Sequence, residues 1–361
     1  MNRPGACDAC LARAWLLSRL AGHLDVVRDR TLPLLALSDT ALIAAVGGAR
    51  RSDLHRELAA FDPGGARAQC AAAGLEQICR CRASYPVSLA GLDAPPAVLH
   101  VAGGLERFLG LVGDCAVAVV GARRPSPYGK EVARSVARGL AAAGVTVLSG
   151  MAMGIDAAAH RGAMDAGAPT VAVLAGAAEL PYPAGARALH AGIRGLGAVV
   201  SELPPGTRTR RWMFPARNRL IAALGVMTVV VEARPGSGAL LTARCAAELG
   251  RRLGAVPGRI TSPLARGPHQ LLREGALLID GCGDVFDGLF GPGASARPER
   301  ALPALSAPLQ ALLDALAEGH GTAAALVRAG LDADRGLAAL ASLELAGRIR
   351  REPGGRYAVL P

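Results

Sequence analysis

The chain has 361 residues, of which 51% are hydrophobic and 19% are charged, so it is long enough for two or three folded domains and too apolar for intrinsic disorder. Its formal net charge of +11 favours a polyanionic partner. All of the 40 basic residues except Lys130 are arginine, which can reflect the base composition of the genome, so clusters of arginine weigh more than the total.

The sequence lacks the patterns of export and membrane insertion. Arg13 and Arg19 interrupt the apolar patch near the N-terminus, and no small-residue cleavage site follows it. No stretch reaches the ~20 apolar residues that a membrane span needs. Eight cysteines in a chain without an export signal indicate reduced thiols. We therefore expect a soluble, cytoplasmic protein without disulfides and without a membrane partner.

The first region in chain order has a helical pattern. Apolar residues recur at helical spacing over residues 11–58, and Ser38 is a candidate N-cap within this stretch. A proline-rich stretch at residues 85–96 then interrupts the pattern. We predict an N-terminal helical domain over residues 1–82, of the SAM or helix-hairpin-helix kind.

The central region alternates between strand and helix patterns. Five short apolar runs rich in valine are separated by helix-like segments, and they cover residues 117–120, 145–148, 170–174, 198–200 and 226–231. Buried parallel strands have such continuous apolar runs. We predict an α/β domain over residues 83–288, with a Rossmann-like, doubly wound, mostly parallel sheet. Ligands of such sheets bind in the loops beyond the carboxyl ends of the strands.

The C-terminal region follows a glycine- and proline-rich stretch at residues 289–303, which indicates a linker. Helical patterns and then two short strands around a turn follow in this order: residues 309–317, 322–329, 334–346, 348–351 and 356–360. This order predicts a winged-helix domain over residues 304–361. Its third helix contains Asp334 and Glu344, so we expect an accessory or protein-contacting role rather than a basic DNA-reading face.

The loop after the first predicted strand contains Gly121, Arg123 and Arg124. A glycine at a strand end lets the backbone approach a phosphate, and the next helix offers amide groups to an anion. The dinucleotide fingerprint G-x-G-x-x-G is absent, and two arginines stand where that motif needs small residues. We therefore expect no nucleotide cofactor.

The loop after the second predicted strand leads to Asp156 and His160, four residues apart on one helix face. An enzyme could use them as an acid–base pair. The favoured interpretation is structural, with the aspartate capping the helix and the histidine satisfied by a hydrogen bond. We expect a protein that is not an enzyme.

The segment from Arg208 to Arg219 combines arginines and aromatic residues without an acidic residue: Arg208, Arg210, Arg211, Trp212, Phe214, Arg217 and Arg219. Such a combination suits single-stranded DNA, because guanidinium groups contact phosphates while rings stack on unpaired bases. The alternative is a solvated basic loop with Trp212 packed on the core.

The loop after the fifth predicted strand contains Ser237 and Gly238 at the start of a helix. These small residues could hold a phosphate or could simply allow close backbone packing. The sequence leaves the two alternatives open.

Four cysteines could supply thiolates to zinc: Cys7, Cys10, Cys79 and Cys81. The first pair forms C-x-x-C, which is a good half-site, and the second forms the less usual C-x-C. Cys70 and His23 compete as ligands. We favour free thiols and no metal, with zinc as the alternative.

The ordered set of motifs resembles the DprA/Smf family of DNA-processing proteins. The strong resemblance covers residues 85–287, and the flanking domains match the family arrangement more loosely. The matching segments are Gly121-Ala122-Arg123, Ser126, Tyr128-Gly129, Ser149-Gly150, Gly154-Ile155-Asp156, His160, Tyr182-Pro183, Ser201-Glu202, the segment 214–219 (FPARNR), Val231-Glu232-Ala233, Ser237-Gly238, Thr242-Ala243 and Val256-Pro257-Gly258.

The resemblance implies a protein that binds and protects single-stranded DNA taken up during natural transformation and helps to load the RecA recombinase on it. It also implies self-association, with a homodimer as the expected form, and single-strand-binding protein as a further candidate partner. No cofactor and no catalytic activity are implied.

The resemblance also assigns residues. The DNA-binding set that it implies is Gly121, Arg123, Arg210, Arg211, Phe214, Arg217, Asn218 and Arg219, with Arg210 and Arg211 replacing lysines of other members. The residues implied to shape the loops are Ser149, Gly150, Gly154, Ser237 and Gly238. The chain departs from the family pattern at residues 174–179, where a second glycine is missing and Glu179 replaces the usual aspartate.

Two other classes of protein remain as alternatives. The first is a Rossmann-like nucleotide hydrolase related to the lysine-decarboxylase-like group, which residues 235–238 faintly resemble. Residues 240–242 contain no counterpart of the catalytic glutamate of that group. The second is a winged-helix transcription regulator, which would need a basic recognition helix that the sequence lacks.

Overall fold

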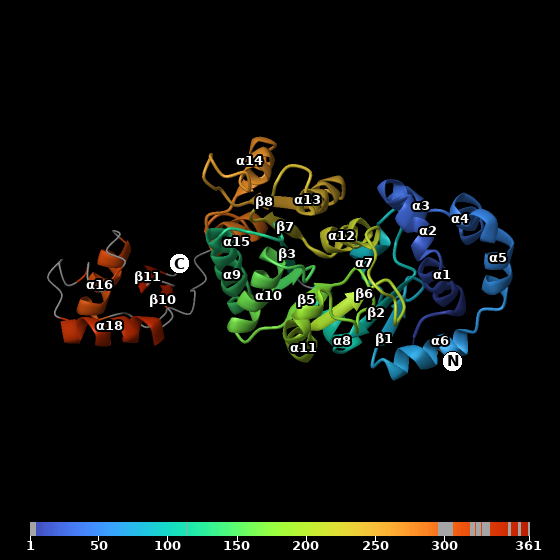
Figure 1. The fold of residues 1–361 in the computed structure, drawn as a ribbon, viewed down its shortest axis with the longest axis horizontal. Coiled ribbons are helices and arrows are strands. Elements are labelled where there is room, and N and C mark those ends of the chain that lie inside the picture. The colour runs from blue at the N-terminus through green and yellow to red at the C-terminus, as the bar shows by residue number, and fades with distance from the viewer. Residues whose placement is uncertain are drawn as a thin grey trace. The chain divides into compact units, whose positions relative to one another are not determined.

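The computed structural model describes residues 5–113, 115–294, 306–317, 322, 326, 333–345, 348–352 and 355–359 (Figure 1). The chain forms two compact units, an N-terminal unit (Met1–Arg297) and a C-terminal unit (Pro298–Pro361). The N-terminal unit contains both the predicted helical region and the whole of the large sheet.

The N-terminal unit is organised around a nine-stranded sheet with the strand order β1-β2-β6-β5-β4-β3-β7-β8-β9. All neighbouring strands from β6 to β9 are parallel, whereas β2 pairs antiparallel with both β1 and β6. The strands are β1 (Glu76–Cys79), β2 (Val98–Ala102), β3 (Ala116–Val120), β4 (Thr146–Ser149), β5 (Thr170–Val173), β6 (Ala198–Ser201), β7 (Met227–Val230), β8 (Arg252–Ala255) and β9 (Leu277–Leu278). This architecture confirms the predicted α/β class.

The five predicted strands correspond to β3 to β7, in which every residue is buried. The sequence prediction missed β1, β2, β8 and β9. At the two ends of the sheet, β1 and β8 each begin with an exposed residue and both residues of β9 are exposed, so their apolar runs are short. Residues 76–79, placed in the helical domain by the sequence, form an edge strand of the sheet instead.

Helices cover both faces of the sheet, because side chains along each central strand alternate between two apolar clusters. The helices that follow β2 in the N-terminal unit are α8 (Leu105–Gly113), α9 (Pro127–Ala142), α10 (Ile155–Asp165), α11 (Arg187–Leu196), α12 (Met213–Leu224), α13 (Gly238–Glu248), α14 (Arg266–Arg273) and α15 (Cys282–Phe290). Val117 and Val119 of β3 pack with α9 and α10, whereas Ala118 and Val120 pack with α8 and α12. Each central strand thus ends in a loop that leads to a helix.

The N-terminal helices lie at the end of the sheet where β1 and β2 are found (Figure 1). Ser38 caps the fourth of them as predicted, since its side chain accepts a hydrogen bond from the amide of Ala41 over 3.3 Å. The helices before β2 are α1 (Asp8–Arg19), α2 (Ala21–Val26), α3 (Thr31–Leu35), α4 (Asp39–Val46), α5 (Arg51–Ala59), α6 (Pro63–Ala72) and α7 (Val87–Ala90).

The core of these helices includes the beginning of α12. Trp212 is completely buried and packs with Leu16, Leu20 and Leu42 in one apolar cluster. Its backbone amide also donates a hydrogen bond to a carboxylate oxygen of Asp25 over 3.1 Å. Trp212 therefore packs on the core, as the alternative interpretation of this segment had it, and is not available to stack on DNA bases. The segment before α12 is fixed to the helical region.

The C-terminal unit contains α16 (Ala307–Ala317), α18 (Ala333–Leu345) and an antiparallel pair of strands, β10 (Ile349–Glu352) and β11 (Arg356–Val359). Leucines of the two helices pack with Ile349 in a small core. The first and third predicted helices and the hairpin are thereby confirmed. Most of the predicted helix over residues 322–329, and residues 295–303 of the predicted linker, lie outside the described residues.

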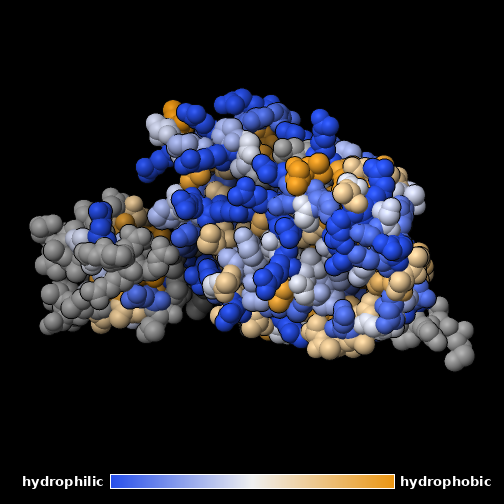
Figure 2. Space-filling view, turned by 45° about the vertical axis from the view of Figure 1, so that its right-hand side comes forward, coloured by the Kyte–Doolittle hydropathy of each residue, from blue (hydrophilic) through white to orange (hydrophobic). Residues whose placement is uncertain are grey.

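Within the described part of the chain, no helix combines the length and the apolar character that crossing a bilayer requires. Figure 2 shows one face of the molecule, on which polar side chains are interspersed with small apolar patches. Large exposed apolar side chains include those of Val26, Val87 and Ile260, which are far apart in the sequence. Scattered exposure of this kind is ordinary for a protein surface.

Candidate nucleic-acid interface

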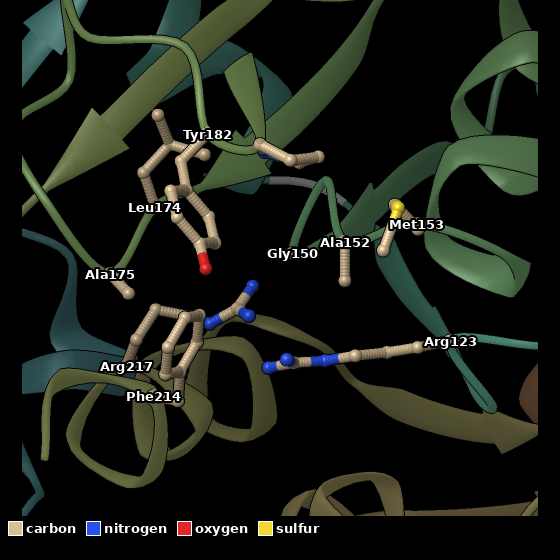
Figure 3. A pocket seen from close by; sticks show the side chains of 10 residues that line it. Arg123, Gly150, Ala152, Met153, Leu174, Ala175, Tyr182, Phe214 and Arg217 are labelled. Atoms are coloured by element: carbon tan, nitrogen blue, oxygen red, sulfur yellow. The ribbon is translucent and has the colours of Figure 1, made fainter. Parts of the chain in front are cut away.

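A small pocket lies beyond the carboxyl ends of β3, β4 and β5, where their loops meet the first turns of α12 (Figure 3). Its volume of about 50 Å³ leaves space for only a few water molecules, so a nucleotide base could lie on it but not inside it. We refer to it as the strand-end pocket, and the lining residues are Arg123, Gly150, Ala152, Met153, Leu174, Ala175, Tyr182, Pro183, Phe214 and Arg217.

One side of the strand-end pocket is a stack of three side chains from distant segments. The guanidinium carbon of Arg123 lies 4.7 Å from the centre of the Phe214 ring. The Phe214 ring lies 5.6 Å from that of Tyr182, and the two planes are tilted by 53°. Tyr182 is 44% exposed and Arg123 is exposed, so this stack is accessible to a ligand. A cation over a ring is attracted to its electron-rich face.

Arg217 forms the floor of the pocket. Its side chain is buried and donates a hydrogen bond from Nη1 to the backbone oxygen of Val173 over 2.9 Å. Figure 3 shows the guanidinium groups of Arg217 and Arg123 pointing toward the same space. Burial lowers the pKa of Arg217 to about 10, with Asp156 opposing and Arg123 adding to the shift. The group therefore stays positively charged at neutral pH.

The position of Arg217 depends on Gly150. A Cβ atom at residue 150 would overlap the guanidinium group of Arg217, so only glycine leaves room for this side chain. The next residue, Met151, has a φ of 53°, a left-handed conformation that non-glycine residues rarely adopt. The loop after β4 is thus shaped closely around the arginine.

Asp156 also stabilises the loop after β4. Its buried carboxylate accepts hydrogen bonds from the amides of Gly150 over 3.2 Å and Ala152 over 3.4 Å. Burial raises its pKa, and the charge of Arg217 opposes that shift. These acceptor contacts support the structural interpretation of Asp156, although the carboxylate braces the preceding turn rather than capping the helix.

His160 also has a structural position. It is fully buried, and its Nδ1 lies 2.8 Å from the hydroxyl of Thr170. Burial lowers the pKa of His160 to about 3, so the ring is neutral at physiological pH. A side chain without access to the pocket surface does not form an acid–base pair for a substrate there.

The loop that contains Arg123 is fixed by Glu232 at the end of β7. The Glu232 carboxylate accepts hydrogen bonds from the amide of Ser126 over 2.8 Å and from its hydroxyl over 2.6 Å. The Ser126 hydroxyl in turn accepts one from the amide of Gly129 over 3.0 Å and so caps α9. Ser126, Tyr182 and Glu232 belong to the motifs of the family resemblance, but none of them was predicted as a site residue.

Two further predicted residues do not line the pocket. Arg219 is buried and forms a bidentate ion pair with Glu202, with nitrogen–oxygen distances of 3.0 and 2.7 Å. Asn218 is buried and donates a hydrogen bond to the backbone oxygen of Gly238 over 3.0 Å. The bonds of both side chains attach α12 to neighbouring segments of the fold. We therefore remove them from the set of residues proposed to contact DNA.

Arg210 and Arg211 are exposed and precede α12, but they are not among the pocket-lining residues. They extend the positive charge of the surface between Trp212 and the exposed Arg208. Their positions are compatible with contacts to a DNA backbone that continues beyond the pocket.

The predicted loop-shaping residues have different surroundings. Ser149 is buried and donates a hydrogen bond to the backbone oxygen of Val119 over 2.6 Å, so it stabilises the sheet. A Cβ atom at Gly121 would lie 2.6 Å from a side-chain carbon of Ile155. Gly154 has a φ of 91°, which favours glycine. The two glycines are required by close packing between the loops after β3 and β4.

Ser237 and Gly238 begin α13 on the other side of α12. The Ser237 hydroxyl is buried, and within the described residues it has no hydrogen-bond partner. The oxygen of Gly238 accepts the bond from Asn218. Neither residue lines the strand-end pocket. A Cβ atom at Gly238 would lie 3.7 Å from the side-chain nitrogen of Asn218, an ordinary contact, so close packing does not require glycine here and phosphate binding at this position stays a prediction.

Glu179, the departure from the family pattern, joins two loops. One of its carboxylate oxygens accepts a hydrogen bond from the amide of Gly206 over 2.6 Å. This contact connects the loop after β5 with the segment before α12. Glu179 thus fixes the backbone near the pocket and does not line it.

The fold and the pocket together define a Rossmann-like α/β protein with a basic and aromatic candidate site beyond its strand ends. Residues 76–289 match the family described as DNA recombination-mediator protein A, and residues 296–355 match the DprA winged helix domain. Because the first match covers more than half of the chain, the protein belongs to this family. The resemblance to DprA/Smf proteins and the predicted winged-helix domain are confirmed.

Individual relatives agree with this placement. The putative DNA processing protein DprA of Mycobacterium tuberculosis is 45% identical over 252 residues, which are 68% of this chain and 64% of the relative. The match therefore spans less than two thirds of that relative's length.

Two solved structures have a similar fold. DprA of Streptococcus pneumoniae is 30% identical, with a TM-score of 0.62 over 76% of this chain and 94% of that chain. DprA of Helicobacter pylori, described by its single-stranded DNA binding mode, is 27% identical, with a TM-score of 0.52 over 60% of this chain and 95% of that chain.

Proposed function

We propose that the protein binds single-stranded DNA at the strand-end pocket and takes part in DNA processing during transformation and recombination. The observation that carries the proposal is the accessible stack of Arg123, Phe214 and Tyr182 beside the charged group of Arg217. An unpaired base can stack on such a surface while the guanidinium groups contact its flanking phosphates. The single-stranded DNA binding of the Helicobacter pylori relative supports the proposal.

The shape of the pocket favours a single strand over a duplex. Phe214 is half-buried at the start of α12 and cannot reach the stacked bases inside duplex DNA. The small volume of about 50 Å³ favours contact with the face of one base rather than enclosure of a nucleotide. The exposed Arg208, Arg210 and Arg211 extend the positive surface along which a flexible backbone can lie.

The proposal is tested by fluorescence anisotropy with labelled single-stranded and duplex oligonucleotides of equal length. We expect the single strand to bind more tightly, and Phe214→Ala to weaken that binding by roughly tenfold, as expected for loss of one stacking contact. Arg123→Ala, which removes the cation over the ring, should act in the same direction. Arg124→Ala is the matched control, because Arg124 is equally exposed but does not line the pocket.

Two results would contradict the proposal. One is equal affinity for duplex and single-stranded DNA. The other is unchanged binding by both Phe214→Ala and Arg123→Ala when circular dichroism shows that the variants are folded.

We also propose the finer roles that the family resemblance implies, namely protection of single-stranded DNA and loading of RecA in the cytoplasm by a homodimer. The test is RecA filament formation on DNA covered by single-strand-binding protein, with and without this protein. We expect faster filament formation with the protein present. No change in rate would contradict the loading role while leaving DNA binding intact.

We propose binding rather than catalysis at the strand-end pocket. The titratable side chains closest to an acid–base pattern, Asp156 and His160, are buried and held by hydrogen bonds. Incubation of labelled DNA with the protein and Mg²⁺ should therefore leave the DNA intact. Strand cleavage that is lost in a His160→Gln variant would contradict this part of the proposal.

A further inference from the structure

Four cysteines from two distant segments come together at the edge of the sheet. Cys7 and Cys10 lie at the beginning of α1, Cys79 is the last residue of β1, and Cys81 follows two residues later. Their four sulfur atoms all lie within 4.8 Å of one another. We call this group the cysteine cluster.

Two distances within the cysteine cluster match those of a tetrahedral metal site. The Sγ atom of Cys81 lies 3.9 Å from that of Cys7 and 3.7 Å from that of Cys10. Four thiolates around Zn²⁺, with Zn–S bonds of about 2.3 Å, form a tetrahedron with edges of about 3.8 Å. A disulfide would need an S–S distance near 2.0 Å. We propose that the cysteine cluster binds one Zn²⁺ ion through its four thiolates.

The backbone around the cluster supports this arrangement. The amide of Cys7 donates a hydrogen bond to the Sγ of Cys79 over 3.4 Å, the kind of contact that orients a thiolate ligand. Arg82 donates to the backbone oxygen of Gly5 over 2.9 Å, and Arg67 donates to that of Ala6 over 3.0 Å and pairs with Asp8. The Arg82 bond holds the segment before α1 against the segment after β1, and the Arg67 bonds hold it against α6.

The charge of the surroundings also fits. A Zn²⁺ ion with four thiolates has a net charge of −2, and such a charge needs compensation close by. Arg80 lies between the two cysteines of the C-x-C pair, and Arg82 follows directly after them. Two cations are thus built into the segment that supplies two of the ligands.

The proposed ion has a structural rather than a catalytic role, because all four coordination positions are filled by protein. It connects the first helix to the edge strand of the sheet across more than 70 residues of sequence, as the separation of 72 between Cys7 and Cys79 shows. Only a small apolar cluster lies at this junction, including Leu11, Ala97 and Val98. A metal crosslink therefore adds stability where few apolar side chains are buried.

The alternatives from the sequence do not compete with this set. Cys70, which the sequence offered as another ligand, packs in a different apolar cluster with residues of α10 and α11. His23 is likewise absent from the group of ligand atoms that converge. Free thiols were favoured from the sequence because the C-x-C pair is a less usual half-site and because Cys70 and His23 competed as ligands.

The proposal is tested by measuring the zinc content of the full chain. The protein is incubated with excess Zn²⁺ under reducing conditions, passed over a desalting column and analysed by mass spectrometry for metals. We expect about one zinc per chain in the wild type and below about a fifth of that in Cys81→Ser, because a structural site needs all four ligands. Cys81 is exposed, so its replacement by serine is compatible with folding.

Cys245→Ala is the control. Cys245 is a buried cysteine on α13 outside the cluster, so this variant should keep the full zinc content. Less than about a tenth of an equivalent of zinc in the wild type would overturn the proposal. Equal zinc in Cys81→Ser and the wild type would overturn it as well.

Cobalt substitution provides a second measurement on the unaltered chain. We expect Co²⁺ to produce the intense visible absorption of a tetrahedral thiolate complex and to be displaced by an equimolar amount of Zn²⁺. A weak spectrum typical of six oxygen or nitrogen ligands would show that the metal binds elsewhere, and it would overturn the assignment to the cysteine cluster.

Discussion

The strand-end pocket and the cysteine cluster lie on the same sheet but are assembled by different means. The pocket is formed by loops at the ends of central strands, and hydrogen bonds from Asp156 and Glu232 fix the loops that shape it. The cysteine cluster lies beside an edge strand, where few apolar side chains are buried. The comparison indicates that hydrogen bonds within the fold are enough to position the pocket side chains at the central strand ends. At the edge of the sheet, the proposed metal ion would supply the crosslink between α1 and β1.

The largest expected effect concerns the pocket. Gly150→Ala should displace the guanidinium group of Arg217, because the new methyl group would occupy its space. We expect a loss of about 2 kcal/mol in binding of single-stranded DNA, or roughly thirtyfold, since a charged hydrogen-bonding group leaves the site. Anisotropy titration measures this loss.

Gly195→Ala is the matched control for that prediction. Gly195 lies within α11, and a Cβ atom there would meet no other atom within 4 Å. Its affinity for DNA should equal that of the wild type. Wild-type affinity in Gly150→Ala would show that Arg217 does not take part in binding.

The next prediction tests whether the cysteine cluster and the strand-end pocket are independent of each other. Removal of the proposed zinc by Cys81→Ser should cost about 2 kcal/mol of stability and lower the melting temperature by roughly 4–8 °C. Binding of single-stranded DNA at 25 °C should change by less than about twofold, because the strand-end pocket is fixed by its own hydrogen bonds. Differential scanning calorimetry and anisotropy measure the two quantities. A large loss of DNA binding would break the comparison, since it would show that the two regions are coupled.

An effect on stability alone concerns pH and the support of the pocket. The pKa of buried His160 is lowered from 6.5 to about 3, so the unfolded chain binds more protons than the folded chain between these values. Stability should therefore fall as the pH decreases from about 6.5 toward 3, by up to about 1.4 kcal/mol per pH unit from this group. The difference between wild type and His160→Gln in urea unfolding isolates the contribution. Parallel pH profiles of the two proteins would contradict it.

The smallest expected effect concerns the C-terminal unit. A chain that ends at Gly293 keeps every residue of the strand-end pocket. We expect its affinity for single-stranded DNA to stay within about twofold of the full chain, since the third helix of the winged-helix domain is not strongly basic. Gel shifts with both proteins test this accessory role. A collapse of affinity in the shortened chain would assign DNA contacts to the winged helix.

The central strands could be predicted from sequence because β3 to β7 are buried on both faces and therefore have continuous apolar runs. The edge strands could not, because their exposed residues shorten the apolar pattern. The contact between Cys7 and Cys79 could not be predicted from the sequence either, because no local pattern specifies a contact between residues so far apart. The spacing within each cysteine pair was the only available signal.

The pocket could be predicted in part. Arg123, Phe214 and Arg217 were identified and do meet, but Arg219 was grouped with them because it is close in sequence. On a helix, residues 214 and 217 share a face, whereas residues 217 and 219 are separated by about 200°. That geometry directs Arg219 toward Glu202. Tyr182 was missed as a site residue, although an aromatic side chain in a chain with 3% aromatic residues was a usable signal.

The burial of Trp212 has a practical consequence for spectroscopy. The chain contains two tryptophans, and both Trp15 and Trp212 belong to the apolar cluster of the N-terminal helices. Trp212 is fully buried although it is only two residues from Phe214. Intrinsic tryptophan fluorescence will therefore report the packing of the N-terminal helices, and bases stacked on Phe214 will not contact either fluorophore. Unfolding of that region can thus be followed optically while DNA is bound.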